Sequence, residues 1–101
     1  MKNQISLFPD PAAERRAAHT CRARECTVNV KPEFLMCGQH WKMVPRKIQA
    51  AVWANYREGQ CDDMSVTREW MTAASAAIGF VAKLEGKLVT RAEYAAMGEF
   101  E

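Results

Sequence analysis

The sequence predicts a small, mainly helical domain with a short β-hairpin in its N-terminal half. Two segments, at about 45–58 and 65–85, repeat apolar residues at the spacing of an α-helix. A different texture precedes them, because residues 19–40 alternate β-type segments with cysteines and turn residues. The length of 101 residues, of which 49% are hydrophobic and 26% charged, is typical of a single globular domain.

The sequence argues against a membrane-spanning or secreted protein. No run approaches the roughly 18 apolar residues of a membrane span. The first residues lack the apolar stretch and cleavage site of a signal peptide. We therefore expect a cytoplasmic protein whose four cysteines are reduced, and so bind metal or are buried. A core of this size is marginal, and a structural metal would strengthen it.

The N-terminal part predicts a tail that leads into the folded domain. Residues 1–9 are expected to be a flexible tail, and residues 10–101 a single domain. Asp10 followed by Pro11 is a typical helix start, with an N-cap before proline at the first helical position. A short helix over residues 12–18 would follow.

Residues 19–41 predict the hairpin. Its strands are expected at 27–30 and 34–36, where β-branched and large apolar residues gather. Between them, Lys31-Pro32-Glu33 is a plausible turn.

The first long helix is expected over about 45–58. Pro45 can open it, and Gly59 is a typical C-terminal stop. Its apolar stripe consists of Ile48, Val52 and Tyr56, widened by Ala51 and Trp53. We expect Trp53 to belong to the core.

The second long helix is expected over about 65–85, with Ser65 as its N-cap and Gly86 at its end. One apolar face recurs with helical periodicity. It consists of Val66, Trp70, Ala74, Ala77, Ile78 and Val81. Thr90 and Glu93 fit a capping box, which predicts a last short helix to about Met97.

Four side chains have the spacing of a structural zinc site. Cys21 and Cys26 form one pair, and Cys37 and His40 form a second pair across the hairpin. Zinc in structural sites prefers four thiolate or imidazole ligands, and protein ligands in all four positions leave none for water. Gly38 would give the backbone freedom to turn between two ligands. The sequence therefore predicts a structural Zn²⁺.

The alternative is three buried free cysteines and a surface histidine. His19 could replace Cys21, but its spacing to Cys26 is less favourable. Cys61 stands alone in a polar loop, and we leave it outside the ligand set.

The tail contains Gln4-Ile5-Ser6-Leu7-Phe8, which resembles the short peptide by which many bacterial and phage proteins bind the DNA sliding clamp. The resemblance implies that Gln4 bonds at the rim of the clamp pocket. It implies that Leu7 and Phe8 fill the apolar cleft, while Ile5 and Ser6 set an extended path. Burying each of the two large side chains is worth roughly 1.5–3 kcal/mol, so the peptide alone would bind modestly. The alternative is that this segment packs onto the protein's own core.

A longer stretch resembles a set of small, uncharacterised phage and prophage proteins over about residues 21–85. The matching pattern is Cys-x4-Cys, then Leu35-Met36-Cys37-x2-His40-Trp41-x2-Val44-Pro45, then Val52-Trp53-x2-Tyr56-Arg57-x-Gly59-Gln60. The resemblance implies the same zinc ligands and a phage origin, but it brings no assigned activity.

Charge is unevenly distributed. Residues 15–47 hold eight basic and two acidic side chains, whereas residues 48–101 hold five basic and eight acidic ones. The basic part suggests contact with an anion, and DNA is the first candidate. The candidate contacts are Arg22, Arg24, Lys42, Arg46 and Lys47. The alternative is an ordinary solvated face. Trp41 is expected to pack in the core rather than stack on a base.

Enzymatic patterns are weak in this sequence. No glycine-rich phosphate loop is present, and His19 has no evident nucleophile partner. We therefore expect a non-enzymatic, phage-type zinc adaptor that binds the host sliding clamp and modulates DNA replication, with no membrane contact and no small-molecule substrate. The alternatives are a zinc-dependent nucleic-acid-binding or regulatory protein without clamp contact, and an inhibitor of a host defence or transcription protein.

Overall fold

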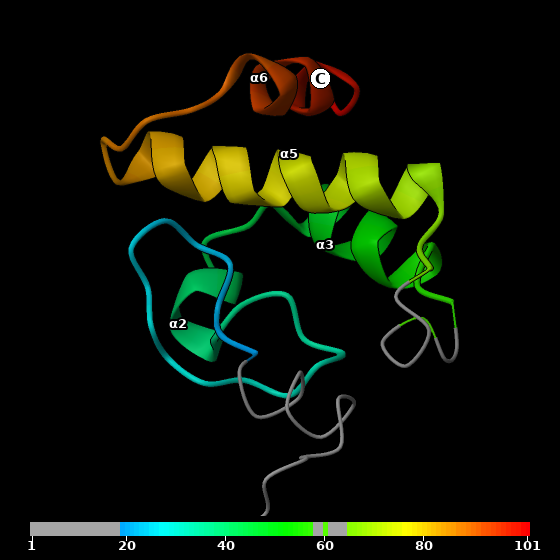
Figure 1. Ribbon diagram of the computed structural model, residues 1–101. Coiled ribbons are helices and arrows are strands. Elements are labelled where there is room, and N and C mark those ends of the chain that lie inside the picture. The colour runs from blue at the N-terminus through cyan, green and yellow to red at the C-terminus, as the bar shows by residue number, and fades with distance from the viewer. Residues whose placement is uncertain (1–18, 58–59, 61–64) are drawn as a thin grey trace, which may run out of the picture.

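The computed structural model describes residues 19–57, 60 and 65–101, and these residues form a mainly helical fold, as predicted (Figure 1). Its helices are α2 (Gly38–Trp41), α3 (Arg46–Ala54), α5 (Arg68–Leu84) and α6 (Arg91–Gly98). The long helix α5 lies between α6 on one side and α3 on the other (Figure 1). No helix in the described part of the chain is long and apolar enough to cross a membrane.

Helix α5 is buried on two opposite faces, where the sequence predicted one. Ala74, Ala77 and Val81 are buried on the expected face. Ala76 and Gly79 are buried on the other side, where α6 packs. Large apolar residues such as Trp70, Ile78 and Val81 mark the predicted face, whereas Ala76 and Gly79 add no large side chain that would mark the second one. The helix therefore forms the centre of the core.

The contact between α5 and α6 is close because Gly79 has no side chain. A Cβ atom built at Gly79 would lie 2.8 Å from Cβ of Glu93 and 3.0 Å from the sulfur of Met97. Both distances are shorter than ordinary van der Waals contacts. Glycine at this position therefore lets the two helices approach.

Helix α3 is shorter than expected, because it ends at Ala54. The sequence pattern also placed Trp53 in the core, where the structure does not have it. Ile48 and Val52 are buried as predicted. The prediction for Trp53 was wrong, because 43% of this residue is exposed. It follows Val52 by about 100° around the helix, which turns it away from the core.

Trp53 instead belongs to a surface group of rings. Its ring lies edge-on to Phe34 at 5.9 Å and tilted to Tyr56 at 5.6 Å. The other two tryptophans, Trp41 and Trp70, are half-buried and pack against the core.

The helix ends follow local capping chemistry. Thr67, and not Ser65, caps α5, because the Thr67 side chain accepts a hydrogen bond from the Trp70 amide. At the other end, Gly86 has a φ of 72°. The Lys87 amide donates to Ala82 and the Gly86 amide to Lys83, which is a Schellman motif.

The capping box at the start of α6 is confirmed. The Glu93 amide donates to the Thr90 hydroxyl, and the Glu93 carboxylate accepts from the Thr90 amide. The helix runs to Gly98, one residue beyond the expected end at about Met97.

The predicted hairpin is not formed as expected. The turn is present, because the Phe34 amide donates to the Lys31 carbonyl. The segments on either side of the turn do not pair with one another. Instead Asn29 forms an isolated antiparallel bridge with Thr20, the only strand pairing in the residues described.

The upstream segment takes the place of the expected partner. The Cys21 amide donates to the Val28 carbonyl, and the Val30 amide donates to the His19 carbonyl. Leu35 and Met36 turn into the core instead. Burial of these two apolar side chains outweighs a short strand pair that includes proline at its turn.

Three sequence predictions lie outside the described residues. They are the tail at 1–9, the helix that Asp10 and Pro11 were expected to open, and the stop at Gly59.

Candidate metal centre

Three cysteines and one histidine lie together beside α2. The donor atoms of Cys21, Cys26, Cys37 and His40 are all within 4.8 Å of one another. These are the four residues that the sequence spacing singles out. A group of this kind can hold a metal ion.

Helix α2 places the second pair of donors. Cys37 is the N-cap of α2 and His40 lies in its single turn. Residues three apart on a helix share a face, so the Cys37 thiol and the His40 ring point the same way. Nδ1 of His40 lies 3.3 Å from Sγ of Cys37. Gly38 has no positive φ, so the turn is made by the helix and not by the glycine conformation that we expected.

A tight loop places the first pair. The Cys26 amide donates to the Ala23 carbonyl, which folds the chain back between the two cysteines. Glu25 adopts a φ of 67° to complete this turn. Sγ of Cys21 lies 3.5 Å from Nδ1 of His40.

The two pairs are joined by the backbone. The Arg22 amide donates to the Leu35 carbonyl at 3.0 Å, so the loop that carries Cys21 is bonded to the segment that leads into Cys37. The burial of Cys21, at 3% exposed, fixes this side of the cluster in the core.

The distances suit tetrahedral coordination. Thiolate sulfur lies about 2.3 Å and imidazole nitrogen about 2.0–2.1 Å from zinc, so a sulfur and a nitrogen on one tetrahedral ion lie about 3.5 Å apart. Both measured separations between Nδ1 of His40 and a cysteine sulfur, 3.5 Å and 3.3 Å, are close to this value.

The thiols of the cluster differ in acidity. Burial raises the pKa of Cys21 to about 11. Burial also acts to raise the pKa of Cys37. Hydrogen bonds from the backbone and side chain of His40, and from the other two thiols, outweigh this effect and lower that pKa to about 7. Cys37 is therefore more readily ionised to the ligand form than Cys21.

The structure adds two charged residues that the sequence analysis missed. Oε2 of Glu85 lies 3.1 Å from Nε2 of His40, on the side of the ring away from the sulfurs. Nζ of Lys87 lies 3.1 Å from Oε1 of the same carboxylate and donates to the Arg24 carbonyl at 2.9 Å. The Lys87 hydrogen bond, with a smaller contribution from His40, lowers the pKa of Glu85 below its usual range. In the sequence, only Gly86 marks this helix end. The contact between Glu85 and His40 joins residues 45 apart, so no local pattern indicates it.

Arg24 joins the cysteine loop to α6. Its Nη2 lies 2.6 Å from both carboxylate oxygens of Glu93, and its Nε donates to the Leu88 carbonyl. Glu93 is almost fully buried. The guanidinium of Arg24 is therefore held by charge-assisted hydrogen bonds within the protein.

The other basic candidates lie at the surface. Arg22, Lys42, Arg46 and Lys47 are all exposed. Lys47 donates to the Phe100 carbonyl at 3.1 Å, which ties it to the C-terminal end of the chain. His19 is not in the metal cluster, because its Nε2 lies 3.0 Å from the Phe34 carbonyl.

Two sets of candidate residues lie outside the described part of the chain. They are the peptide Gln4, Ile5, Ser6, Leu7 and Phe8, and the separate cysteine Cys61.

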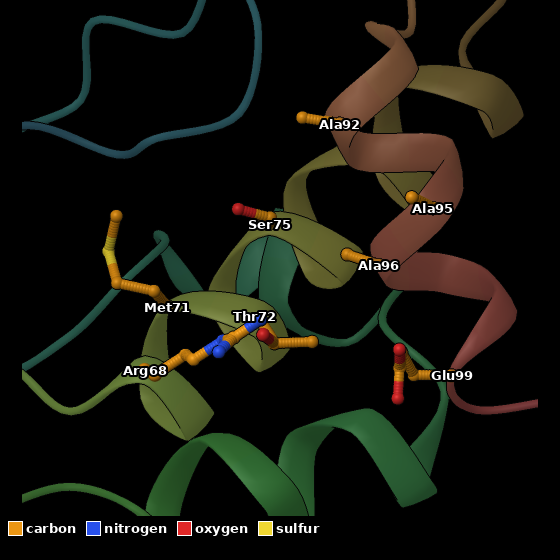
Figure 2. Close-up of a pocket in the computed structure, with 8 residues that line it drawn as sticks. All are labelled: Arg68, Met71, Thr72, Ser75, Ala92, Ala95, Ala96 and Glu99. Carbon is orange, nitrogen blue, oxygen red and sulfur yellow. The ribbon is translucent and has the colours of Figure 1, made fainter.

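The described part of the chain also has two surface hollows, apart from the metal cluster. One, of about 330 Å³, lies between α5 and α6, with Ser75 and three alanines of α6 along it and Arg68 and Glu99 at one end (Figure 2). The other, of about 260 Å³, is apolar and is lined by Phe34, Trp41 and Trp53 among others.

Comparisons of the chain with protein-family models, with curated proteins and with solved structures found no match. The function is therefore argued from the site and from the sequence motifs.

Proposed function

We propose that Cys21, Cys26, Cys37 and His40 bind one structural Zn²⁺ that holds the N-terminal half of the fold together. The observation that carries this proposal is the convergence of four soft or borderline donors within 4.8 Å of one another. Thiolate and imidazole together favour zinc over magnesium or calcium, which prefer oxygen.

The role of this zinc is structural. Protein side chains fill all four tetrahedral positions, so no position is left for a reactive water or a substrate. The metal would join the loop that carries Cys21 and Cys26 to the start of α2, and binding energy of this kind is folding energy.

The zinc assignment is tested by metal analysis of the purified protein. We expect one zinc per wild-type chain and loss of that zinc in Cys37→Ser. Cys61→Ser is the matched control, because it removes a cysteine outside the ligand set and should retain one zinc. A wild-type chain that binds no zinc under reducing conditions contradicts the assignment.

For the protein as a whole, we propose a non-enzymatic, phage-type adaptor that binds the bacterial sliding clamp through Gln4, Leu7 and Phe8 and modulates DNA replication in the host cytoplasm. The support is the match of all five motif positions at residues 4–8. The four candidate metal ligands lie downstream of this peptide, between residues 21 and 40, and the body that they hold would carry it. If the body also contacts DNA, two weak contacts on one chain raise avidity.

The clamp proposal is tested by affinity capture with purified sliding clamp. Wild-type protein should retain the clamp, and the Gln4/Leu7/Phe8 triple alanine variant should not, while both bind zinc equally. Equal capture of the clamp by the two proteins overturns the proposal.

The second candidate is zinc-dependent binding of nucleic acid without clamp contact. It is favoured by the exposure of Arg22, Lys42, Arg46 and Lys47. A mobility shift of plain DNA that weakens steeply with salt, together with no capture of the clamp, would support it. If neither partner binds, the remaining candidate is inhibition of a host defence or transcription protein.

A further inference from the structure

The imidazole of His40 is held from both sides. Nδ1 faces the sulfurs of Cys21 and Cys37 at 3.5 Å and 3.3 Å. Nε2, on the opposite side of the ring, lies 3.1 Å from Oε2 of Glu85. A carboxylate only accepts hydrogen bonds, so this contact requires a proton on Nε2. In a neutral imidazole that proton leaves the lone pair of Nδ1 directed at the sulfurs.

Glu85 reaches His40 because of the way α5 ends. Glu85 is the C-cap of α5, and the left-handed Gly86 reverses the chain directly after it. The reversal brings Lys87 back beside Glu85, with Nζ 3.1 Å from Oε1. Each carboxylate oxygen therefore has its own partner, and the carboxylate is held in one orientation.

The same helix end also contacts the other ligand pair. Nζ of Lys87 donates to the carbonyl of Arg24, which lies between Cys21 and Cys26. The residues at and just after the end of α5 thus contact both segments that carry the donors. The imidazole and the carboxylate are 45 residues apart in sequence and are only 14% and 24% exposed.

We propose that Glu85 is a positioning residue for the metal centre: it accepts the Nε2 proton of His40 and so presents Nδ1 to the metal. This inference rests on the zinc site proposed above and adds a fifth residue to it. A hydrogen-bonded carboxylate fixes the tautomer and orientation of a histidine ligand and increases its basicity. Lys87 supports the carboxylate and is not itself in contact with the imidazole.

Removal of the carboxylate should weaken metal binding without abolishing it. The four donor side chains remain in Glu85→Ala, so the stoichiometry stays at one zinc per chain. The imidazole loses its fixed orientation, and loss of such a partner weakens metal affinity by about 10- to 100-fold. In Glu85→Gln the amide oxygen can accept the same proton, so that variant should recover most of the affinity.

The experiment is a competition between the protein and a chromophoric chelator for Zn²⁺, with Kd measured for wild type, Glu85→Ala and Glu85→Gln. Glu99→Ala is the matched control, since Glu99 is an exposed glutamate at the C-cap of α6, away from the cluster. We expect wild-type affinity in the control. The second measurement is the ¹⁵N NMR spectrum of His40 in the zinc-bound protein, which reports which ring nitrogen carries the proton.

Wild type should show a protonated Nε2 and a metal-bound Nδ1, and the Nε2 proton signal should be lost or exchange faster in Glu85→Ala. A merely structural role for Glu85 would not move this signal. Unchanged affinity in Glu85→Ala, or metal bound to Nε2, overturns the role of Glu85 and leaves the zinc site intact. A wild-type chain that takes up no zinc overturns both.

Discussion

Glu25 has an unfavourable backbone conformation, and the metal loop requires it. It is the only residue other than glycine with a positive φ in the described part of the chain. Glu25 adopts it in the turn between Cys21 and Cys26, directly before the second of these cysteines. The side chain contributes little, because its ion pair with Lys87 is long, at 3.7 Å, and the side chain is 80% exposed.

Glu25→Gly should therefore stabilise the zinc-bound protein by about 0.5–1 kcal/mol, since glycine adopts a positive φ without steric cost. Glu33→Gly is the control, because Glu33 is also exposed in a turn but has no positive φ, and it should be neutral or destabilising. Thermal denaturation of the two variants measures the difference. A loss of stability in Glu25→Gly would contradict the strain argument.

The thiols should differ in reactivity when the metal is removed. With a pKa lowered to about 7, Cys37 is largely thiolate at pH 7.5, whereas Cys21, raised to about 11, stays protonated. Because the thiolate is the nucleophile, Cys37 should be alkylated before Cys21, and the rate at Cys37 should fall as the pH drops below 7.

This prediction is measured by alkylation with iodoacetamide in the presence of a chelator, followed by mass spectrometry. Added zinc should protect both thiols. Faster labelling of Cys21 than of Cys37 would show that the acidity of the two groups is reversed.

At the scale of helices, the α5–α6 contact depends on a single missing side chain. Gly79 faces Glu93, which is bonded to Arg24 and to the Thr90 amide and so cannot move freely. Gly79→Ala should cost about 1–3 kcal/mol, because a new methyl group overpacks this contact.

Gly98→Ala is the matched control for Gly79→Ala. A Cβ atom at Gly98 meets nothing within 4 Å, so this change should be neutral or slightly stabilising. Chemical denaturation compares the two. Equal stability of the variants would show that α6 can shift away at little cost.

The buried and exposed faces of helix α3 should differ in how much a truncated side chain costs in stability. Ile48→Ala should destabilise by about 2–5 kcal/mol, because it opens a cavity in the core. Trp53→Ala removes a larger side chain, yet it should cost about 1 kcal/mol, because much of that ring is already in water. Denaturant titration of both variants tests this order. A larger loss for Trp53 would indicate that its contacts with Phe34 and Tyr56 are structural.

At the scale of the whole molecule, the metal segment and the helices share one core. Cys21, Ala23, Leu35 and Met36 belong to the same buried cluster as Ile48 and Val81. The polar contacts of Arg24 and Glu85 add further links between the cysteine loops and the α5–α6 end. Neither part buries its apolar surface alone.

We therefore expect one cooperative thermal transition whose midpoint rises with free zinc, because a ligand that binds only the folded state stabilises it in proportion to log concentration. A strong chelator should lower the midpoint and reduce the helical circular dichroism signal. Retention of the full helical signal after metal removal would show that the helices fold independently of the metal segment.

Local features were predicted from the sequence with good accuracy. The helical pattern of α3 and α5, the stop at Gly86 and the capping box of Thr90 and Glu93 depend on residues within a few positions of one another. The ligand set Cys21, Cys26, Cys37 and His40 also came from spacing, and the structure brings its donor atoms together.

Chain folding over long separations decided the rest. The docking of the elements decided three features: the segment that pairs with Thr20, the exposure of Trp53, and the carboxylate that contacts His40. His40 and Glu85 are 45 residues apart, and Arg24 and Glu93 are 69 residues apart, so no periodicity in the sequence relates these partners. Sequence alone determined the three longer helices and the candidate ligands, because both follow from local geometry, but it did not predict the single turn of α2. Only the tertiary structure placed Glu85 and Lys87 at the metal centre, because that contact forms only once α5 has docked.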